Sequence, residues 1–252
     1  MCSSAGAAHI ASSLSVADIL TVLYTGGANI RPDNQQDPHR DVVVVSKGHA
    51  AAALYAALGH AGFFPLEWLL RYGQDGQPLG GHVTAGIVPG VEFSTGSLGH
   101  GLPFACGLAY ARKLSASTSR VFVVLSDGEC DEGSNWEGAL FAAHHELSGL
   151  TALIDRNGLQ SLTSTENTLA LEPLADKWAS FGWRVTEVSG HDHDAIMRSL
   201  IPVPGDARPH VVICRTVKGK GVSFMEDDVA WHYRPPADNQ VALALQEILA
   251  EE

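Results

Sequence analysis

The chain contains five short apolar runs rich in β-branched residues, and these runs limit its possible folds more than any other feature of the sequence. They cover residues 42–45, 121–125, 151–154, 184–188 and 211–214. Several of them lack the alternation of apolar and polar residues that is typical of a strand with one face in water. Continuous apolar strands are instead typical of a parallel sheet that helices cover on both faces.

Helical signals separate these runs. Ser15 stands in a cap-like position in one helical stretch, and Ser134 followed by Glu137 fits a capping box at the start of another. The second helix should bury one face, made of Trp136, Ala139, Leu140, Ala143 and Leu147. Because strands and helices alternate, we expect an α/β fold with a doubly wound, mostly parallel sheet and helices on both faces, in a single domain over residues 1–252.

The composition argues against several classes of protein. The 16 basic and 28 acidic residues give a net charge of −12, and the absence of a basic run argues against a nucleic-acid-binding groove. No window reaches about eighteen uninterrupted apolar residues, and no secretory signal is evident, so we expect neither a membrane span nor export. The four cysteines are scattered without metal-finger spacing, as in a reduced, cytoplasmic protein.

An acidic turn follows the run at residues 121–125. Asp127 comes just after this run, and Gly128 follows it, where a glycine allows the backbone to approach a ligand closely. Asn157 comes just after the next run, 29 positions beyond Gly128, which leaves room for a crossover helix. The two strand ends should then lie side by side, with Asp127 and Asn157 facing one hard cation such as Mg²⁺. Two unrelated turns are the alternative for isolated Asp-Gly and Asn-Gly pairs.

Motifs across nearly the whole chain resemble the N-terminal, diphosphate-binding part of transketolase, and more closely the N-terminal subunit of a split transketolase. In chain order they are "AHIASSLSVADIL", "VVSKGHAAAALYAAL", "PGVEFSTGSLGHGL", "SDGECDEGSNWEGALFAAHHELSGL", "IDRNGLQ", "FGWRVTEVSGHD", "TVKGKGVSFME" and "WHYRPP". The resemblance implies a thiamine diphosphate-binding fold. It also implies transfer of a two-carbon ketol unit from a ketose, expected to be phosphorylated, to an aldehyde or another acceptor.

The resemblance assigns cofactor and metal roles to particular positions. Asp127, Asn157 and the backbone carbonyl of Leu159 would hold Mg²⁺, for which Ca²⁺ or Mn²⁺ can substitute. The backbone N–H groups of Gly128 and Glu129 would meet the diphosphate. The remaining cofactor contacts are expected from His49, Gly96, Ser97, Leu98, Asn157 and His232.

Four of the twelve histidines lie in matching motifs. By resemblance, His9, His82 and His232 are the catalytic residues around the reacting carbon chain, and His49 lies against the diphosphate. Neutral imidazoles can accept and return the protons that a ketose and an aldehyde exchange near pH 7. Most histidines in proteins are structural or lie on the surface, which is the interpretation for His39, His60, His144, His145, His191, His193 and His210.

The family glutamate that activates thiamine lies in a pyrimidine-binding domain, and residues 1–252 contain no counterpart of this domain or of the family's C-terminal domain. We therefore expect a C-terminal transketolase-like partner subunit that carries this glutamate, in a two-fold heterotetramer that acts on small sugars. Two alternatives are a subunit of a thiamine-dependent 2-oxo acid decarboxylase or acyl-transfer enzyme, and a non-catalytic assembly subunit.

Three departures from the family pattern stand near the expected site. Ser126 replaces the first glycine of the G-D-G motif, which matters only if that position needs a positive φ. His100 replaces a usual glutamine, and residues 161–163 replace a glycine-containing turn. These changes fit an altered substrate and neutral drift equally well. The "KGKG" stretch at residues 218–221 lacks the full P-loop pattern and is not interpreted as one.

Overall fold

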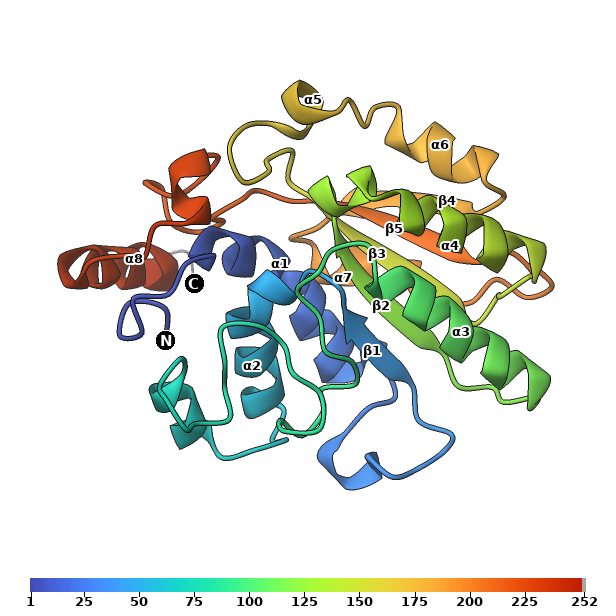
Figure 1. Cartoon of the computed structure of the whole chain (residues 1–252), viewed down its shortest axis with the longest axis horizontal. Helices are drawn as coiled ribbons and strands as arrows, with labels where there is room; N and C mark the ends of the chain where they lie inside the picture. The colour runs from blue at the N-terminus through green and yellow to red at the C-terminus, as the bar shows by residue number, and fades with distance from the viewer. Residues whose placement is uncertain (251–252) are drawn as a thin grey trace.

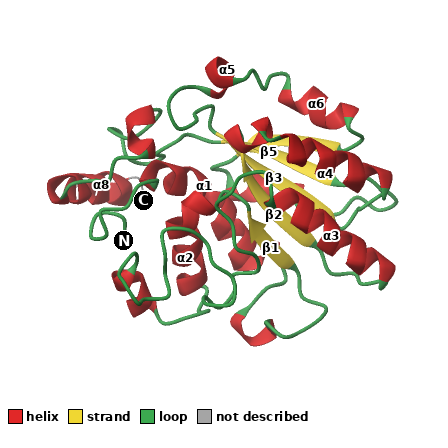
Figure 2. Ribbon diagram, viewed as in Figure 1, coloured by secondary structure: helices red, strands yellow, loops and turns green. Residues whose placement is uncertain are grey.

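The computed structural model describes residues 1–250 and contains a five-stranded sheet in which every neighbouring pair of strands is parallel (Figures 1 and 2). The strands are β1 (Val42–Val45), β2 (Val121–Ser126), β3 (Leu150–Arg156), β4 (Arg184–Ser189) and β5 (His210–Arg215). Their order across the sheet is β1-β2-β3-β5-β4. The predicted parallel α/β sheet is therefore confirmed.

Helices cover both faces of this sheet, as the continuous apolar strands require. The longer helices are α1 (Ile10–Val22), α2 (Ala51–His60), α3 (Gly101–Leu114), α4 (Gly133–His144), α6 (Leu174–Ser180), α7 (His193–Ser199) and α8 (Asp238–Ala250), and α5 (Thr165–Thr168) is a single turn. Val43 and Val45 pack in one core with α1, α2 and α7. Val42 and Val44 pack in a second core with α3, α4 and α6. Successive residues of one strand therefore fill two separate cores.

Two expected helix starts are wrong. Because α1 begins at Ile10, Ser15 lies in its second turn, where its hydroxyl donates to Asp155 Oδ2 at 2.6 Å instead of capping the helix. At α4 the N-cap residue is Glu132, and Ser134 donates its hydroxyl proton to the carbonyl of Gly99 at 2.6 Å. Both serines bond to segments distant in sequence, and such tertiary contacts outweigh a local capping preference.

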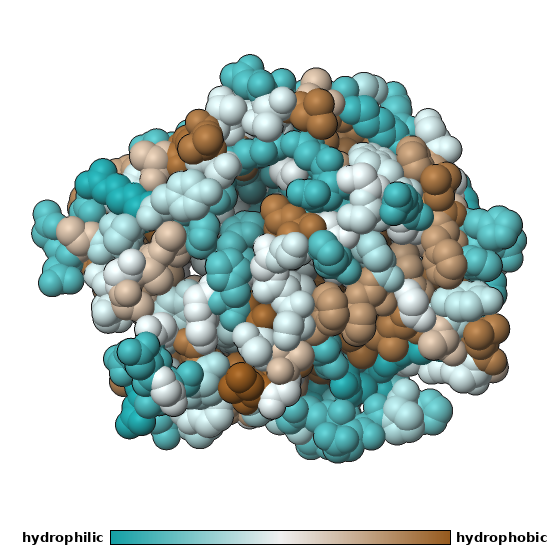
Figure 3. Space-filling model, in the orientation of Figure 1, coloured by the Kyte–Doolittle hydropathy of each residue, from teal (hydrophilic) through white to brown (hydrophobic). Residues whose placement is uncertain are grey.

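The buried face of α4 also differs from the expected one. Leu140 is 59% exposed, while the small residues Gly138, Ala139 and Ala142 are buried. The backbone carbonyl of Gly138 accepts a weak hydrogen bond from the thiol of Cys106 on α3. The two helices therefore pack closely through small side chains, and the larger Leu140 points outward. Figure 3 shows hydrophobic residues on this side of the molecule, where Phe104, Leu140 and Phe141 are exposed.

The segment Ile10–Gly27 is long and apolar enough to cross a membrane, by length and composition alone. However, 61% of it is buried inside the fold, where Val16, Ile19 and Leu20 join the core around α2. This burial is typical of the core helix of a soluble protein. The four cysteines are all buried and free, as expected from their scattered positions.

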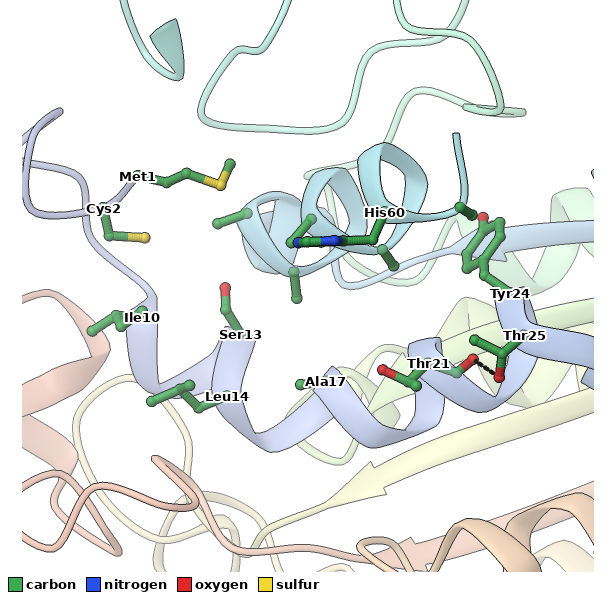
Figure 4. Close-up of a pocket in the computed structure, with 15 residues that line it drawn as sticks. Met1, Cys2, Ile10, Ser13, Leu14, Ala17, Thr21, Tyr24, Thr25 and His60 are labelled. Atoms are coloured by element: carbon green, nitrogen blue, oxygen red, sulfur yellow. Dashed lines mark hydrogen bonds between the residues drawn. The ribbon is translucent and has the colours of Figure 1, made fainter. Parts of the chain in front are cut away.

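A groove of about 650 Å³ lies between α1 and α2 (Figure 4). Its walls consist mainly of alanines and other apolar side chains from these two helices. Cys2 and His60 are also among its lining residues, and the hydroxyl of Thr25 bonds to the carbonyl of Thr21 at 2.7 Å. The groove lacks converging charged groups and therefore differs from a catalytic site in its chemistry.

His210, at the start of β5, should make the protein less stable in mild acid. Burial, followed by the charge of Arg184, lowers the pKa of its imidazole to about 4. Between about pH 6.5 and pH 4 the unfolded chain therefore binds a proton that the folded chain does not, so stability falls as the pH decreases. Lowering the pH from 7 to 5 should reduce the free energy of unfolding of the wild type. We expect the reduction in His210→Gln to be smaller than in the wild type by about 1–2 kcal/mol.

Urea denaturation at the two pH values measures this difference. The control variant His39→Gln alters an exposed imidazole and should follow the wild type. Equal losses in the wild type and in His210→Gln would show that His210 does not contribute to acid sensitivity.

Candidate active site at the carboxyl ends of the strands

A cavity of about 320 Å³ lies beyond the carboxyl ends of β2 and β3, where parallel α/β sheets usually bind ligands. Four segments that are distant in sequence bring histidines to it, and two lysines and the two strand ends complete its walls. Its lining residues are His9, Ser12, Lys47, His49, His82, Gly96, Leu98, Ser126, Asp127, Gly128, Asn157, Leu159, Gln160, Ser161, Lys218, His232 and Tyr233. The cavity therefore includes most of the positions expected from the sequence.

The pairing of β2 with β3 brings Asp127 and Asn157 to the same cavity. Ser126 pairs with Asp155, and the backbone N–H of Asp127 donates to the carbonyl of Asp155 at 3.2 Å. The carboxylate of Asp127 accepts from the N–H of Gly158 at 2.6 Å. The spacing of the Asp-Gly and Asn-Gly turns thus leads to the expected side-by-side placement.

The carboxylate of Asp127 is almost fully buried. It also accepts from the N–H of Gly128 at 2.8 Å and pairs with Arg156 at 3.1 Å. Burial raises the pKa of Asp127, and the negative charge of Asp155 raises it further, while these donors act in the opposite direction. An additional cation beside this carboxylate would therefore be stabilising.

The three oxygen groups expected to hold a metal ion all line the cavity. Residues 1–250 contain no cluster of three His, Cys, Asp or Glu side chains able to bind a metal, so a cation here would depend on amide and carbonyl oxygens as well. The side-chain oxygen of Asn157 accepts from the N–H of Leu159 at 3.1 Å, and the carbonyl of Leu159 accepts from Lys218 Nζ at 3.3 Å. One carboxylate, one amide and one carbonyl fit the preference of Mg²⁺ for hard oxygen ligands, with the remaining positions left for a ligand or water.

The four motif histidines lie together. The ring centroid of His9 lies 5.3 Å from that of His49, 6.2 Å from that of His82 and 4.9 Å from that of His232. Burial is the largest cause of the shift at two of these rings. It lowers the pKa of His9, and it lowers the pKa of His49 well below its usual value. Burial and the charge of Lys218 also lower the pKa of His232 to about 3. These three rings are therefore neutral at pH 7.

Two residues at the start of α1 that line this cavity each have a side-chain polar atom without a hydrogen-bond partner. His9 is the N-cap residue of this helix with φ +70°, and its Nδ1 is buried without a hydrogen-bond partner among residues 1–250. The hydroxyl of Ser12 is buried and unpaired in the same way. Buried polar groups in proteins almost always have partners, so these two atoms indicate that the cavity takes a polar ligand.

The sequence interpretation missed two buried lysines in this cavity. Lys218 is 2% exposed, and its ammonium donates to Nδ1 of His232 at 3.0 Å. Burial, followed by the charge of Lys47, lowers the pKa of Lys218 to about 8. Lys47 differs because it forms a buried ion pair with Asp155. The "SKGH" and "KGKG" stretches contain these lysines, but neither motif reveals which lysine has a carboxylate partner.

Two of the three residues expected from the glycine-rich loop line the cavity. Gly96, with φ +154°, lies against His82, and it lines the cavity together with Leu98. Ser97 is exposed and lies outside the cavity lining. The side chain of Glu129 is fully buried behind the cavity, where it accepts from the hydroxyl of Ser46 and from the N–H of Gly99 at 2.9 Å. Its carboxylate therefore holds the loop in place.

The three departures from the family pattern have separate structural settings. Ser126 ends β2 and is not among the residues with positive φ, so a non-glycine residue is accommodated there. His100 is exposed and is not among the lining residues, and its Nδ1 contacts the carbonyl of Leu98 at 3.0 Å. The turn at residues 161–163 is closed by a hydrogen bond from the N–H of Gln160 to the carbonyl of Thr163 at 2.8 Å. Gln160 also bonds to Asp131 at 2.6 Å.

The histidines interpreted as structural lie outside the cavity lining. His39, His60 and His144 are exposed, and His210 is buried in the sheet. His191 and His193 both bond to the carboxylate of Asp18 on α1.

Comparisons with known proteins agree with this geometry. Residues 1–250 match the family model of the thiamine diphosphate binding domain of transketolase. The chain is 42% identical to an apulose-4-phosphate transketolase subunit of Actinobacillus succinogenes, over 96% of this chain and 88% of that protein. It is 37% identical to a 6-deoxy-6-sulfo-D-fructose transketolase subunit of Clostridium sp., over 98% of this chain and 90% of that protein.

A solved structure shows the same fold. The transketolase from Campylobacter jejuni superimposes with a TM-score of 0.89 at 26% identity, and the match covers 98% of this chain and 40% of that one. The chain thus spans less than half of this solved transketolase and nearly the full length of the two subunits. The chain belongs to the transketolase family, and it corresponds to that family's thiamine diphosphate binding domain.

Proposed function

We propose that this chain is the diphosphate-binding subunit of a two-component transketolase that transfers a two-carbon ketol unit from a ketose, phosphorylated in our proposal, to an aldehyde or another acceptor. The observation that carries the proposal is a single cavity that combines hard oxygen ligands, a buried lysine and four histidines. The resemblance to relatives that are themselves named as single subunits of transketolases supports it.

In this proposal, separate lining residues would bind the metal ion and the diphosphate of Mg²⁺–thiamine diphosphate. Asp127, Asn157 and the carbonyl of Leu159 would hold the metal. The ammonium of Lys218, buried at the cavity wall, would face the diphosphate, where its charge stabilises an anion. Bound thiamine diphosphate supplies the electron sink that carbon–carbon cleavage of a ketose needs.

The histidines would handle protons at the substrate. Lys218 donates to Nδ1 of His232, so the proton of this neutral ring lies on Nε2. His9 contributes the unpaired Nδ1 described above. Together with His82, these neutral rings would accept the proton of a donor hydroxyl and return one to the acceptor oxygen. His49, beside His9, would contact the cofactor.

The missing parts of the site would come from a partner. In our proposal, a C-terminal transketolase-like subunit supplies the glutamate that activates thiamine, and two copies of each subunit form a two-fold heterotetramer in the cytoplasm. The chain would act as one diphosphate-binding domain. The exposed apolar side chains Phe104, Leu140 and Phe141 on α3 and α4 support an interface on this side of the molecule.

The test is a ketol-transfer assay with this chain, the partner subunit, Mg²⁺ and thiamine diphosphate. We expect transfer from a ketose phosphate, such as fructose 6-phosphate or apulose 4-phosphate, to an aldehyde only when both subunits are present. Full activity of this chain alone would contradict the two-component proposal. Turnover of pyruvate in place of ketoses would favour a 2-oxo acid decarboxylase, and a lack of cofactor binding in calorimetry with and without the partner would favour an assembly subunit.

A further inference from the structure

His191 links α1 to the segment that leads into Lys218. The ring Nδ1 of His191 donates to Asp18 Oδ2 at 2.7 Å, and the backbone N–H of Val217 donates to Nε2 of the same ring at 2.9 Å. Because Nε2 accepts a hydrogen bond, the proton of this ring lies on Nδ1. A single neutral tautomer therefore satisfies both partners.

A second connection runs parallel to the first. Ser15, one helical turn before Asp18, donates to Asp155 Oδ2 at 2.6 Å, and Thr216 donates its hydroxyl proton to the other oxygen of Asp155. Residues 15 and 18 of α1 are thus connected to the consecutive residues 216 and 217. The two connections fix both the helix and the backbone just before Lys218.

The backbone around His191 is built for this contact. Gly190 donates its N–H to the carbonyl of Arg215 at 2.7 Å. A Cβ atom at Gly190 would lie 2.3 Å from the side chain of Thr216, so only glycine allows this close approach. His191 lies in the short turn between β4 and α7, and the contact at Gly190 fixes the start of this turn against the end of β5.

The far end of the link is in the candidate active site. Val217 directly precedes Lys218, whose ammonium lies 3.0 Å from His232 Nδ1 and 3.3 Å from the carbonyl of Leu159. The next residue, Gly219, donates its N–H to the carbonyl of Ala11 in the first turn of α1. A shift of the backbone at Val217 would consequently move the buried ammonium relative to the cavity.

We propose that His191 is a positioning residue that orders the backbone at Val217 and so holds the ammonium of Lys218 against the diphosphate of the cofactor. The inference rests on the proposed function, because this diphosphate is the anion that Lys218 would meet. His191 touches neither the cofactor nor the substrate, and it acts through Val217 and Asp18.

Two substitutions separate the two hydrogen bonds of the ring. The amide of His191→Asn can take the place of Nδ1 and still donate to Asp18, but it does not reach Val217. The amide oxygen of His191→Gln can take the place of Nε2 and accept from Val217. His193→Gln is the matched control, because His193 bonds to the other oxygen of Asp18 from a half-exposed position.

The first measurement is the affinity of the full chain, assembled with its partner subunit, for thiamine diphosphate at saturating Mg²⁺ by calorimetry. We expect about 10-fold weaker binding for His191→Asn, while His191→Gln stays within about 3-fold and His193→Gln within about 2-fold of wild type. At saturating cofactor, kcat should change less than the cofactor affinity. Equal affinity of His191→Asn and wild type would overturn the inference.

The second measurement is amide hydrogen exchange at Val217, which does not depend on the cofactor. Exchange should be about 10-fold faster or more in His191→Asn and should return toward the wild-type rate in His191→Gln. Unchanged exchange in His191→Asn would also overturn the inference. A wild-type protein that binds no thiamine diphosphate, but whose Val217 exchange responds to His191→Asn, would refute the proposed function and leave the link itself intact.

Discussion

Replacing Asp127 by asparagine should lower the ketol-transfer activity of the assembled enzyme by about 100-fold or more at limiting thiamine diphosphate, since changes behind metal ligands already cost about 10- to 100-fold. Asparagine keeps the size of the side chain but removes its charge, and in our proposal this charge attracts Mg²⁺. The buried Arg156 would also lose a carboxylate partner at 3.1 Å. Steady-state assays over a range of Mg²⁺ and thiamine diphosphate concentrations measure the effect.

The matched control for this variant is Asp176→Asn, which removes an exposed carboxylate on α6, outside the cavity lining. It should retain wild-type activity. High concentrations of Mg²⁺ should restore part of the activity of Asp127→Asn, because the amide and carbonyl oxygens of Asn157 and Leu159 remain. An Asp127→Asn enzyme with wild-type activity at limiting cofactor would exclude Asp127 as a metal ligand.

Replacing Asp155 by alanine should reduce the free energy of unfolding by about 3–5 kcal/mol, because removal of one partner leaves a buried charge uncompensated. Asp155 is fully buried, and Lys47, its partner, is 1% exposed. The ammonium of Lys47 holds the pKa of Asp155 below its usual value despite the opposing effect of burial. Ser15 and Thr216 would lose their acceptor at the same time.

Urea denaturation at pH 7 measures this loss of stability. The control is Asp33→Asn, which breaks the exposed ion pair with Arg31 and should change the free energy of unfolding by less than about 1 kcal/mol. The double variant Lys47→Met, Asp155→Leu should recover part of the loss, because it removes both buried charges. A loss below about 1 kcal/mol in Asp155→Ala would show that Lys47 finds another stabilising environment.

The sheet could be predicted from the sequence because its signal is local. The valine run at residues 42–45 has no polar member, and the structure buries every one of its side chains. The separation of 29 positions between Gly128 and Asn157 along the chain was equally informative. A crossover of that length returns a parallel strand beside the first. These two features predict that Asp127 and Asn157 lie side by side at neighbouring strand ends, and in the structure both line one cavity.

Other features depend on partners that no local pattern reveals. Ser134 looked like a helix cap, but its hydroxyl bonds to Gly99 instead. Lys47 and Lys218 are each followed by a glycine in the sequence. Nevertheless, Asp155 pairs with Lys47, while Lys218 faces His232. Burial of Glu129 behind the glycine-rich loop was also hidden, because residue spacing does not show which side of a turn faces the cavity. Tertiary contacts decide each of these cases.

The cluster of four imidazoles has a consequence for the order in which the molecule is made. His9 is the N-cap residue of the first helix, and the backbone N–H of His9 donates to the carbonyl of His232 at 2.9 Å. During synthesis, His9 is added before the first strand of the sheet, and His232 is added after the last one. A growing chain that has completed β1, β2 and β3 thus still lacks Lys218 and His232, and the cavity is complete only after residue 232 has been added.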